Sequence, residues 1–366
     1  MRKAGAPPES LHDILGLTFT EFADIASRIL ASGKGAAGAV YAGAFAKGVL
    51  DANVLGLVPA SIRGWEDNFR VGLLEPCEAQ EEEGEFGVTV KATMRLADGA
   101  EIECVRVPMP SKPDGKPRSS ICVSSQVGCR MGCAFCETGQ RGFVRNLGAS
   151  EIVSELVTAR AILGWDVGNV VFMGMGEPLD NLDNVAKALA VMTDGRGLGL
   201  SWERLTVCTS GDAGKIKELR RLGHPRLNLS LILNAAEDTK RDSIMPYYRR
   251  SNLDALAEAL VAYPGRRNFV LALNWCLLPG INDSREDARM LGGFSRRIGR
   301  SIVNLIPYNP GALPIARAPE EEEVARFRSW LEEEGCMVKL RSLKGRDIMA
   351  GCGQLGGSSR KAPATG

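Results

Sequence analysis

Three cysteines lie close together in the chain, at positions 129, 133 and 136. Their spacing, C-x-x-x-C-x-x-C, lets the thiolates bind three irons of a [4Fe–4S] cluster and leaves the fourth iron open to another molecule. A zinc ion would need a fourth cysteine or histidine nearby, and the only histidines, His12 and His224, are distant in sequence. We therefore expect one [4Fe–4S] cluster on Cys129, Cys133 and Cys136.

Composition and charge restrict the class of protein. The 366 residues are 45% hydrophobic and 24% charged, which is typical of a globular protein with one large domain and a small extra module. No apolar run reaches the roughly 18 residues of a membrane helix, and the opening MRKAGAPPES has no signal-peptide core. We expect a cytoplasmic protein without a membrane association. Because the net charge is only +1, an RNA partner would have to bind a local basic patch.

The part of the chain before the cysteine cluster divides into two segments. Residues 1–64 read as a helical module. Residues 65–118 read as a β-hairpin extension and a linker, because apolar residues alternate over 88–96, a turn follows at Ala97-Asp98-Gly99, and alternation resumes from Ile102. Residues 358–366 form a short tail, for which we expect flexibility.

The core, residues 119–357, alternates short apolar runs with helical patterns. The expected strands are 120–124, 169–173, 204–208, 227–233, 268–276, 301–307 and 336–341, and the expected helices include 184–192 and those containing Leu253 and Val324. Such alternation predicts a parallel sheet, which we interpret as a partial (βα)6 barrel of the α/β class. In these folds the chemistry gathers at the carboxyl ends of the strands, and the cysteine loop follows the first of them.

Four stretches, in this order, carry a family resemblance. They read CVSSQVGCRMGCAFCETGQRGFVRNLGASEI at 122–152, FMGMGEPLDNLDNV at 172–185, VNLIPYNP at 303–310 and GRDIMAGCGQLGG at 345–357. The chain thereby resembles the RlmN family, radical S-adenosylmethionine (SAM) enzymes that methylate adenine in RNA and whose relatives include the resistance enzyme Cfr. The first 65 residues match this family poorly.

The resemblance implies a mechanism and three catalytic residues. Two SAM molecules are used per turnover: the first methylates Cys352, and the second is cleaved reductively at the cluster to activate that methyl group for addition to the adenine ring. Cys122 then forms a transient disulfide with Cys352, and Glu103 matches the base that removes the ring proton. Each residue also has a structural alternative: a packed thiol for Cys352, a strand residue for Cys122 and a solvated carboxylate for Glu103.

The family's SAM contacts match further positions. Gly176 and Glu177 of the GMGEP turn match the contact to the methionine amino group, as suits a close backbone approach and a carboxylate. Asn309 matches a contact on the adenosine side, and Cys208 stands where the family usually has a serine.

The chain departs most from the family at 228–238, NLSLILNAAED, where the family has Ser-Leu-His. One registration places Ile232, Leu233 and Asn234 on that motif; the other places Ser230 on its first position. We include both Ser230 and Asn234 among the expected SAM contacts. With Asn274 at a position where the family commonly has glutamate, these changes indicate a divergent member.

We therefore expect an RNA methyltransferase that acts at C2 of adenine rather than C8, in ribosomal RNA, transfer RNA or both. The expected partners are this RNA and an electron donor such as flavodoxin or ferredoxin, and the expected state is a monomer. Two alternatives stay open. One is a radical SAM enzyme that methylates a peptide or small molecule; the other is a non-catalytic iron–sulfur redox sensor associated with RNA or ribosomes, which would not need Glu103 or Cys352.

Overall fold

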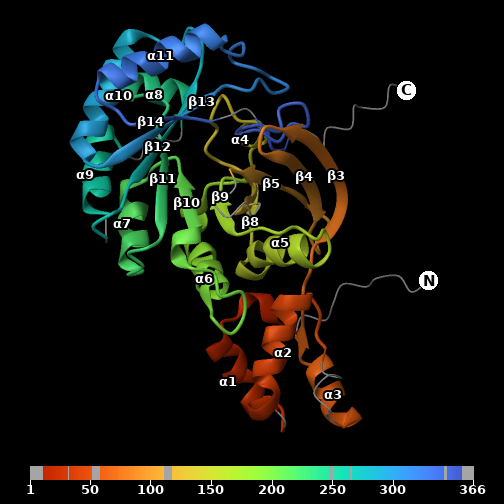
Figure 1. The fold of residues 1–366 in the computed structure, drawn as a ribbon. Coiled ribbons are helices and arrows are strands. Elements are labelled where there is room, and N and C mark those ends of the chain that lie inside the picture. Colours follow the sequence, from red (N-terminus) through yellow and green to blue (C-terminus); the bar gives the residue numbers. More distant parts are fainter. Residues whose placement is uncertain are drawn as a thin grey trace, which may run out of the picture.

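The computed structural model describes residues 11–31, 33–51, 58–110, 118–246, 251–263, 266–341 and 344–356. Most of these residues build a strongly curved sheet with helices on its outer side, and a small helical unit projects from one end (Figure 1). The expected tail at 358–366 and most of the expected linker before residue 118 lie outside the described residues.

The second half of the sheet is parallel and forms the partial barrel. Its strands pair in chain order, β6–β9–β10–β11–β12–β13–β14, and every pair is parallel. This arrangement confirms the expected α/β barrel. The strands are β6 (Arg118–Cys122), β9 (Asn169–Phe172), β10 (Leu205–Thr209), β11 (Asn228–Ile232), β12 (Leu271–Leu277), β13 (Ser301–Pro307) and β14 (Val338–Leu340).

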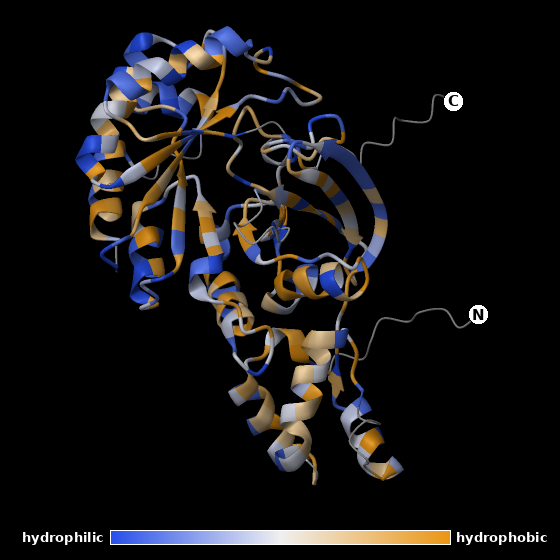
Figure 2. Cartoon of the chain, viewed as in Figure 1, coloured by the Kyte–Doolittle hydropathy of each residue, from blue (hydrophilic) through white to orange (hydrophobic). Residues whose placement is uncertain are grey.

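The helices between these strands bury one apolar face each. In α9, Leu253, Leu256 and Leu260 are buried, as their spacing predicted. Figure 2 shows the resulting pattern, with hydrophobic strands inside and hydrophilic outer helix faces. The helices of the core are α4 (Glu137–Arg141), α5 (Ala149–Ala161), α6 (Leu182–Thr193), α7 (Ala213–Arg221), α8 (Asp238–Ile244), α9 (Leu253–Ala262), α10 (Arg285–Ile298) and α11 (Glu321–Glu333).

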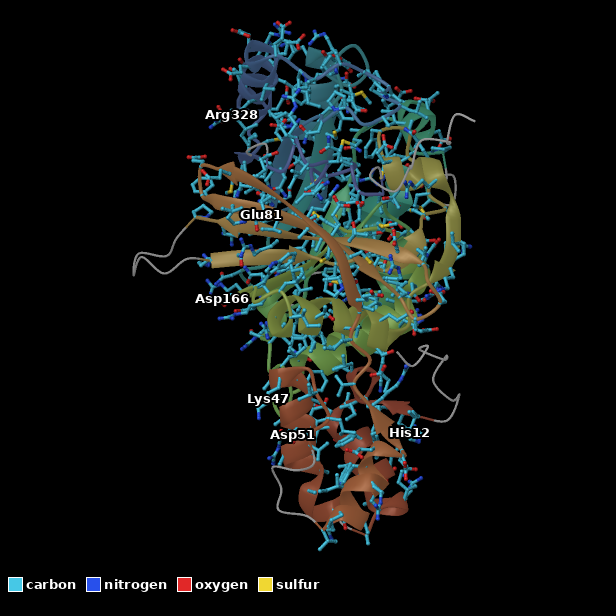
Figure 3. All side chains as sticks on the ribbon, turned by 90° about the vertical axis from the view of Figure 1, so that its right-hand side faces the viewer. His12, Lys47, Asp51, Glu81, Asp166 and Arg328 are labelled. Atoms are coloured by element: carbon cyan, nitrogen blue, oxygen red, sulfur yellow. The ribbon has the colours of Figure 1, made fainter. Side chains whose placement is uncertain are left out.

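The predicted hairpin is present as β4 (Gly87–Arg95) and β5 (Glu101–Met109). β5 pairs antiparallel with β6, so the hairpin continues the barrel sheet. The sequence prediction missed β3 (Glu75–Gly84), which pairs with β4 at the edge of the sheet. Its sequence EPCEAQEEEG shows no apolar alternation, because an edge strand exposes its charges to solvent and is protected by them from pairing with other chains. Glu81 points outward from this strand (Figure 3).

The N-terminal unit is helical, with an aromatic core. It contains β1 (His12–Asp13), η1 (Ile14–Gly16), α1 (Phe19–Ile29), α2 (Gly33–Lys47), α3 (Pro59–Glu66) and β2 (Phe69–Arg70). The rings of Phe22 and Phe69 lie 4.9 Å apart, and that of Trp65 lies 5.8 Å from Phe22. The boundary expected at 64/65 falls inside α3, and β2 pairs with β1. None of the helices in the described ranges is long and apolar enough to cross a bilayer.

A buried carboxylate joins α5 to the end of β6. The backbone N–H of Ser124 donates to both carboxylate oxygens of Glu155 at 3.0 Å, and Glu155 is fully buried. The hydroxyl of Ser124 donates to the carbonyl of Glu103 and accepts from the N–H of Met175. Burial raises the pKa of Glu155 well above its ordinary value of 4.5, with only the Ser124 hydrogen bond opposing it.

This raised pKa predicts a stability that falls with pH. The native state keeps a proton that the unfolded chain loses above pH 4.5, so each pH unit above that costs up to about 1.4 kcal/mol until the native group also ionises. Glu155→Gln keeps an acceptor for Ser124 and removes the titration. We expect the Tm of the variant, relative to wild type, to rise from pH 5 to pH 7.5 in thermal melts. The exposed Glu322→Gln is the control, and parallel curves for Glu155→Gln and wild type would contradict the prediction.

Candidate active site

An open cavity lies at the carboxyl ends of the parallel strands, with a volume of about 850 Å³ including its mouth. Its walls include one residue from the end of each of five successive strands: Phe172, Cys208, Ile232, Cys276 and Ile306. The cavity also receives residues from the loops that follow β7 (Gln126–Gly128), β9, β10, β11 and β14. The size and position are those of a cofactor site in a barrel.

The cysteine loop runs from β7 (Gln126–Gly128) to α4 and is held by backbone hydrogen bonds. The N–H of Cys129 donates to the carbonyl of Gly142 at 2.9 Å, and that of Ala134 to the carbonyl of Ile244 at 2.9 Å. Gly128 has φ +75°, and a Cβ there would lie 2.0 Å from the oxygen of Gly142. Only glycine therefore allows the loop to approach β8 (Phe143–Asn146) this closely.

All three clustered cysteines, Cys129, Cys133 and Cys136, line the cavity. Burial raises the pKa of Cys129 to about 12 and that of Cys133 well above its ordinary value, so the thiols keep their protons until a metal displaces them. Among the described residues, no three histidine, cysteine or acidic side chains converge closely enough to hold a single metal ion. Three thiols around a shared cavity fit a cluster, in which each thiolate binds a different iron.

The turn after β9 places a buried carboxylate in the cavity wall. Gly176 has φ +100°, and a Cβ there would lie 2.6 Å from the Cβ of Gln126. Glu177 accepts hydrogen bonds from the backbone N–H and the hydroxyl of Ser210, both at 2.8 Å. Burial raises the pKa of Glu177 against these bonds. A carboxylate in this setting can accept from an ammonium group that enters the cavity.

A row of polar side chains crosses the strand ends opposite this turn. The amide nitrogen of Asn274 donates to the sulfur of Cys208 at 3.3 Å and to the hydroxyl of Ser230 at 2.7 Å. The amide of Asn304 donates in turn to the oxygen of Asn274 at 2.9 Å. Cys208 and Asn274 line the cavity, whereas Ser230 is not among the lining residues. Burial raises the pKa of Cys208.

Asn234 lies at the end of β11 in a left-handed conformation, with φ +56°. Its side-chain oxygen accepts from the N–H of Cys276 at 2.8 Å, and it lines the cavity together with Ile232. These positions favour the registration that places Ile232 and Asn234, not Ser230, on the family's Ser-Leu-His motif. Asparagine tolerates the left-handed region better than most residues, which explains why this residue is accommodated there.

Sequence reasoning missed Arg241, which organises these strand ends. This fully buried side chain of α8 donates to the carbonyls of Ile232 and Leu233 at 2.9 and 2.8 Å, and to that of Ser210. It thus satisfies backbone groups that the ends of β10 and β11 leave open. The sequence signal was only an arginine in the short helix after β11, a position that a surface arginine would occupy equally well.

Cys352 lies in the segment 344–356, which follows β14 and lies against α4 and β5. The N–H of Glu137 donates to the carbonyl of Gly353 at 2.7 Å, and the hydroxyl of Thr138 to that of Leu355 at 2.6 Å. The N–H of Gly356 donates to Oε2 of Glu103 at 2.7 Å. These bonds hold Cys352 at the cavity wall, where its surface is exposed to the cavity.

The structure brings Glu103 and Cys122 to the same region as Cys352. Glu103 is buried on β5, not solvated on the outer face of the hairpin. Cys122 is half-buried at the end of β6, with its thiol free. Burial, with a smaller effect of negative charge on Cys352, raises the pKa of Cys122 to about 12. Cys352 lines the cavity, whereas Glu103 and Cys122 are not among its lining residues.

Asn309 follows β13 and is buried beside the Cys352 segment. A Cβ at Gly351 would lie 2.5 Å from the side-chain amide nitrogen of Asn309, so the Gly351 backbone packs directly against the Asn309 side chain. The side-chain oxygen of Asn309 has no hydrogen-bond partner among the described residues. A buried acceptor without a partner is costly, and a ligand N–H or O–H would satisfy it.

Known proteins with similar sequences point to one family for this chain. Residues 123–291 match the radical SAM superfamily. The chain is 40% identical over 270 residues to a protein of Protochlamydia amoebophila named probable dual-specificity RNA methyltransferase RlmN 1, which covers 74% of each chain. It is 41% identical over 275 residues to the dual-specificity RNA methyltransferase RlmN of Syntrophotalea carbinolica, which covers 75% of this chain and 71% of the relative.

A solved structure agrees over nearly the whole chain. The crystal structure of a radical SAM methyltransferase from Sphaerobacter thermophilus superimposes with a TM-score of 0.83 at 32% identity. The match covers 94% of this chain and 99% of that one. The similarity therefore includes the N-terminal helices as well as the barrel.

The contacts that Glu137 makes with the Cys352 segment depend on Gly311. Oε1 of Glu137 accepts from the N–H of Ala312 at 2.7 Å, and a Cβ at Gly311 would lie 2.0 Å from that oxygen. Gly311→Ala should displace Glu137 and free the segment, which lowers its local opening free energy by about 1–3 kcal/mol. Hydrogen-exchange mass spectrometry should show faster exchange over 351–356. Gly293→Ala on α10, where nothing crowds the added methyl, is the control, and unchanged exchange in Gly311→Ala would refute this role.

Proposed function

Because the chain belongs to the RlmN family of radical SAM RNA methyltransferases, which implies a [4Fe–4S] cluster and SAM, we propose that it methylates a ring carbon of adenine, C2 rather than C8. The observation that supports this proposal best is the placement of Cys352. Its segment carries a thiol from the far end of the chain into the cavity of the three clustered cysteines, and the backbone N–H of Gly356 in that segment donates to Glu103 on β5.

In this proposal Cys129, Cys133 and Cys136 hold the cluster, which supplies the electron that cleaves SAM and so provides the radical for methyl activation. Glu177 accepts a hydrogen bond from the amino group of the methionine part, and Gly176 allows that group to approach the backbone. Cys208 and Asn234 contact SAM from the strand ends, with Ser230 supporting Cys208 through Asn274. The unpartnered oxygen of Asn309 accepts from the adenosine part.

Cys352 is the methyl acceptor in the first half of the reaction, and it must lose its proton to act as a nucleophile. The surrounding protein raises the pKa of this thiol, whereas the positive charge of Arg341 acts in the opposite direction. Arg341 also opposes the rise in the pKa of Cys122. One cation therefore favours the reactive form of both thiols.

Glu103 and Cys122 complete the second half of the reaction. After the methyl carbon has bonded to the ring, the radical adduct gives its unpaired electron to the oxidised electron carrier, and the proton on the ring carbon passes to the Glu103 carboxylate. The Cys122 thiolate then attacks the sulfur of Cys352. The bond between that sulfur and the former methyl carbon breaks, its electron pair goes to the carbon, and the carbon takes a proton, which frees the methylated base and leaves a disulfide. An external thiol reduces this disulfide before the next turnover. Two SAM molecules are used, one for each half.

The proposed partners follow from this chemistry. The substrate is ribosomal RNA, transfer RNA or both, and the enzyme acts as a monomer in the cytoplasm. A flavodoxin or ferredoxin supplies the electron. A peptide or small-molecule substrate is the outcome to which a negative RNA experiment would point.

The test is an anaerobic reaction with the cluster-loaded protein, a reductant, and SAM with a deuterated methyl group. Ribosomal and transfer RNA are supplied separately, and the nucleosides are analysed by mass spectrometry. We expect labelled 2-methyladenosine from wild type and none from Cys352→Ala. Labelled 8-methyladenosine would revise the ring position. Deoxyadenosine formation without any labelled base would reject RNA as the substrate.

The ligand assignment makes a separate prediction about iron. Replacing Cys133 with alanine removes one of three thiolates, so we expect the reconstituted variant to lose most of its iron and sulfide. Cys276→Ala changes another thiol of the same cavity and should keep the wild-type content. Equal iron in Cys133→Ala and wild type would contradict the assignment.

A further inference from the structure

Glu103 has a buried cationic neighbour that the proposed reaction does not use. Nζ of Lys91 lies 4.0 Å from Oε1 of Glu103, and the two side chains are 1% and 5% exposed. They come from the adjacent strands β4 and β5, where Lys91 is paired with Val105 and Thr93 with Glu103. The pair therefore lies diagonally across two strands, on the side of the sheet that faces the Cys352 segment.

Lys91 and Glu103 contact the loop that carries Cys352 on both sides of that cysteine. Nζ of Lys91 lies 3.5 Å from the carbonyl oxygen of Met349, three residues before Cys352. Oε2 of Glu103 accepts from the N–H of Gly356, four residues after it. Met349 adopts φ +53°, which turns the chain toward Lys91. The two charged side chains thus span the loop from one end to the other.

Stability alone does not account for a lysine at this position. Burial is the largest effect on Lys91 and lowers its pKa, against the negative charges of Glu103 and Glu78. A buried ion pair is commonly no more stabilising than apolar side chains of the same volume. Perturbed charged groups cluster at functional sites, and this pair contacts the loop that carries Cys352.

We propose that Lys91 is a positioning residue for the proton transfer of this reaction, holding Glu103 as an oriented base toward an adenine bound at Cys352. The inference rests on the proposed function. In the step, the radical adduct gives its unpaired electron to the oxidised form of the electron carrier. The bond between the ring carbon and its hydrogen then breaks, the proton moves to the Glu103 carboxylate, and the electron pair stays in the ring. The Gly356 N–H and the Lys91 ammonium fix the carboxylate from two sides, so its orientation is set before the adenine arrives.

Lys91 acts only in the second half of the reaction. Methylation of Cys352 needs no base at Glu103. The loop is also held by hydrogen bonds to Glu137 and Thr138 that do not involve Lys91, so we expect it to keep its place when Lys91 is changed. Without an oriented base, the bond between RNA and Cys352 forms but resolves slowly. A covalent protein–RNA adduct should therefore accumulate.

The experiment compares wild type, Lys91→Met, Glu103→Gln and the double variant. For Lys91→Met we expect Cys352 methylation within about twofold of wild type and RNA methylation at least about tenfold slower. A protein–RNA adduct should be visible on denaturing gels. In the Glu103→Gln background, Lys91→Met should change the rate by less than about twofold, because a residue that acts through Glu103 has no further effect once Glu103 is removed.

Several results would overturn the inference. These are a wild-type rate of RNA methylation in Lys91→Met, independent losses that multiply in the double variant, or parallel losses of Cys352 methylation and RNA methylation. If Lys91→Met does not fold, Lys91→Gln is measured in the same way and the same criteria apply. Absence of RNA methylation in the wild type would instead refute the proposed function, and so the two failures are distinguishable.

Discussion

The structure depends on the C-terminal segment, which connects one edge of the sheet to the other. β14 and β3 are the two edge strands, so the barrel is open between them. The segment 344–356 starts from β14 and reaches the opposite strands (Figure 1). The backbone N–H groups of Gly345 and Asp347 donate to Glu82 on β3, both at 2.7 Å, and that of Gly356 donates to Glu103 on β5. The same segment therefore closes the open side of the barrel and places Cys352 at the cavity.

The cavity is lined by several thiols and by buried polar groups, and this determines its electrostatics. Burial raises the pKa of the clustered cysteines, of Cys122 and of Glu177, so the empty protein favours neutral forms. Positive charge acts against this effect: Arg341 acts on Cys352, Arg241 acts on Cys133, and Lys91 lies beside Glu103. In the proposed reaction, metal binding and the two arginines favour thiolates in a site that disfavours charge.

The sequence predicted the parallel strands, the hairpin and the cysteine loop, because each follows from local periodicity or spacing. It missed β3, whose glutamates match no strand pattern since only the pairing with β4 makes it a strand. It also left the registration at 228–238 open. Either Ser230 or Asn234 could have reached the cavity, and the packing of the strands, which places Asn234 there, cannot be read from the sequence. Arg241 and Lys91 were not found because buried cations are rare and look like surface residues in a sequence.

The most direct test of this account is the location of the first methyl group on the protein. The cluster-loaded enzyme is incubated with SAM carrying a deuterated methyl group, without RNA, and its peptides are mapped by mass spectrometry. The account predicts the label on Cys352, in the segment that closes the barrel, and on no other cysteine of the cavity. Label on Cys122, Cys208 or Cys276, or no label on a protein that cleaves SAM when reduced, would contradict it.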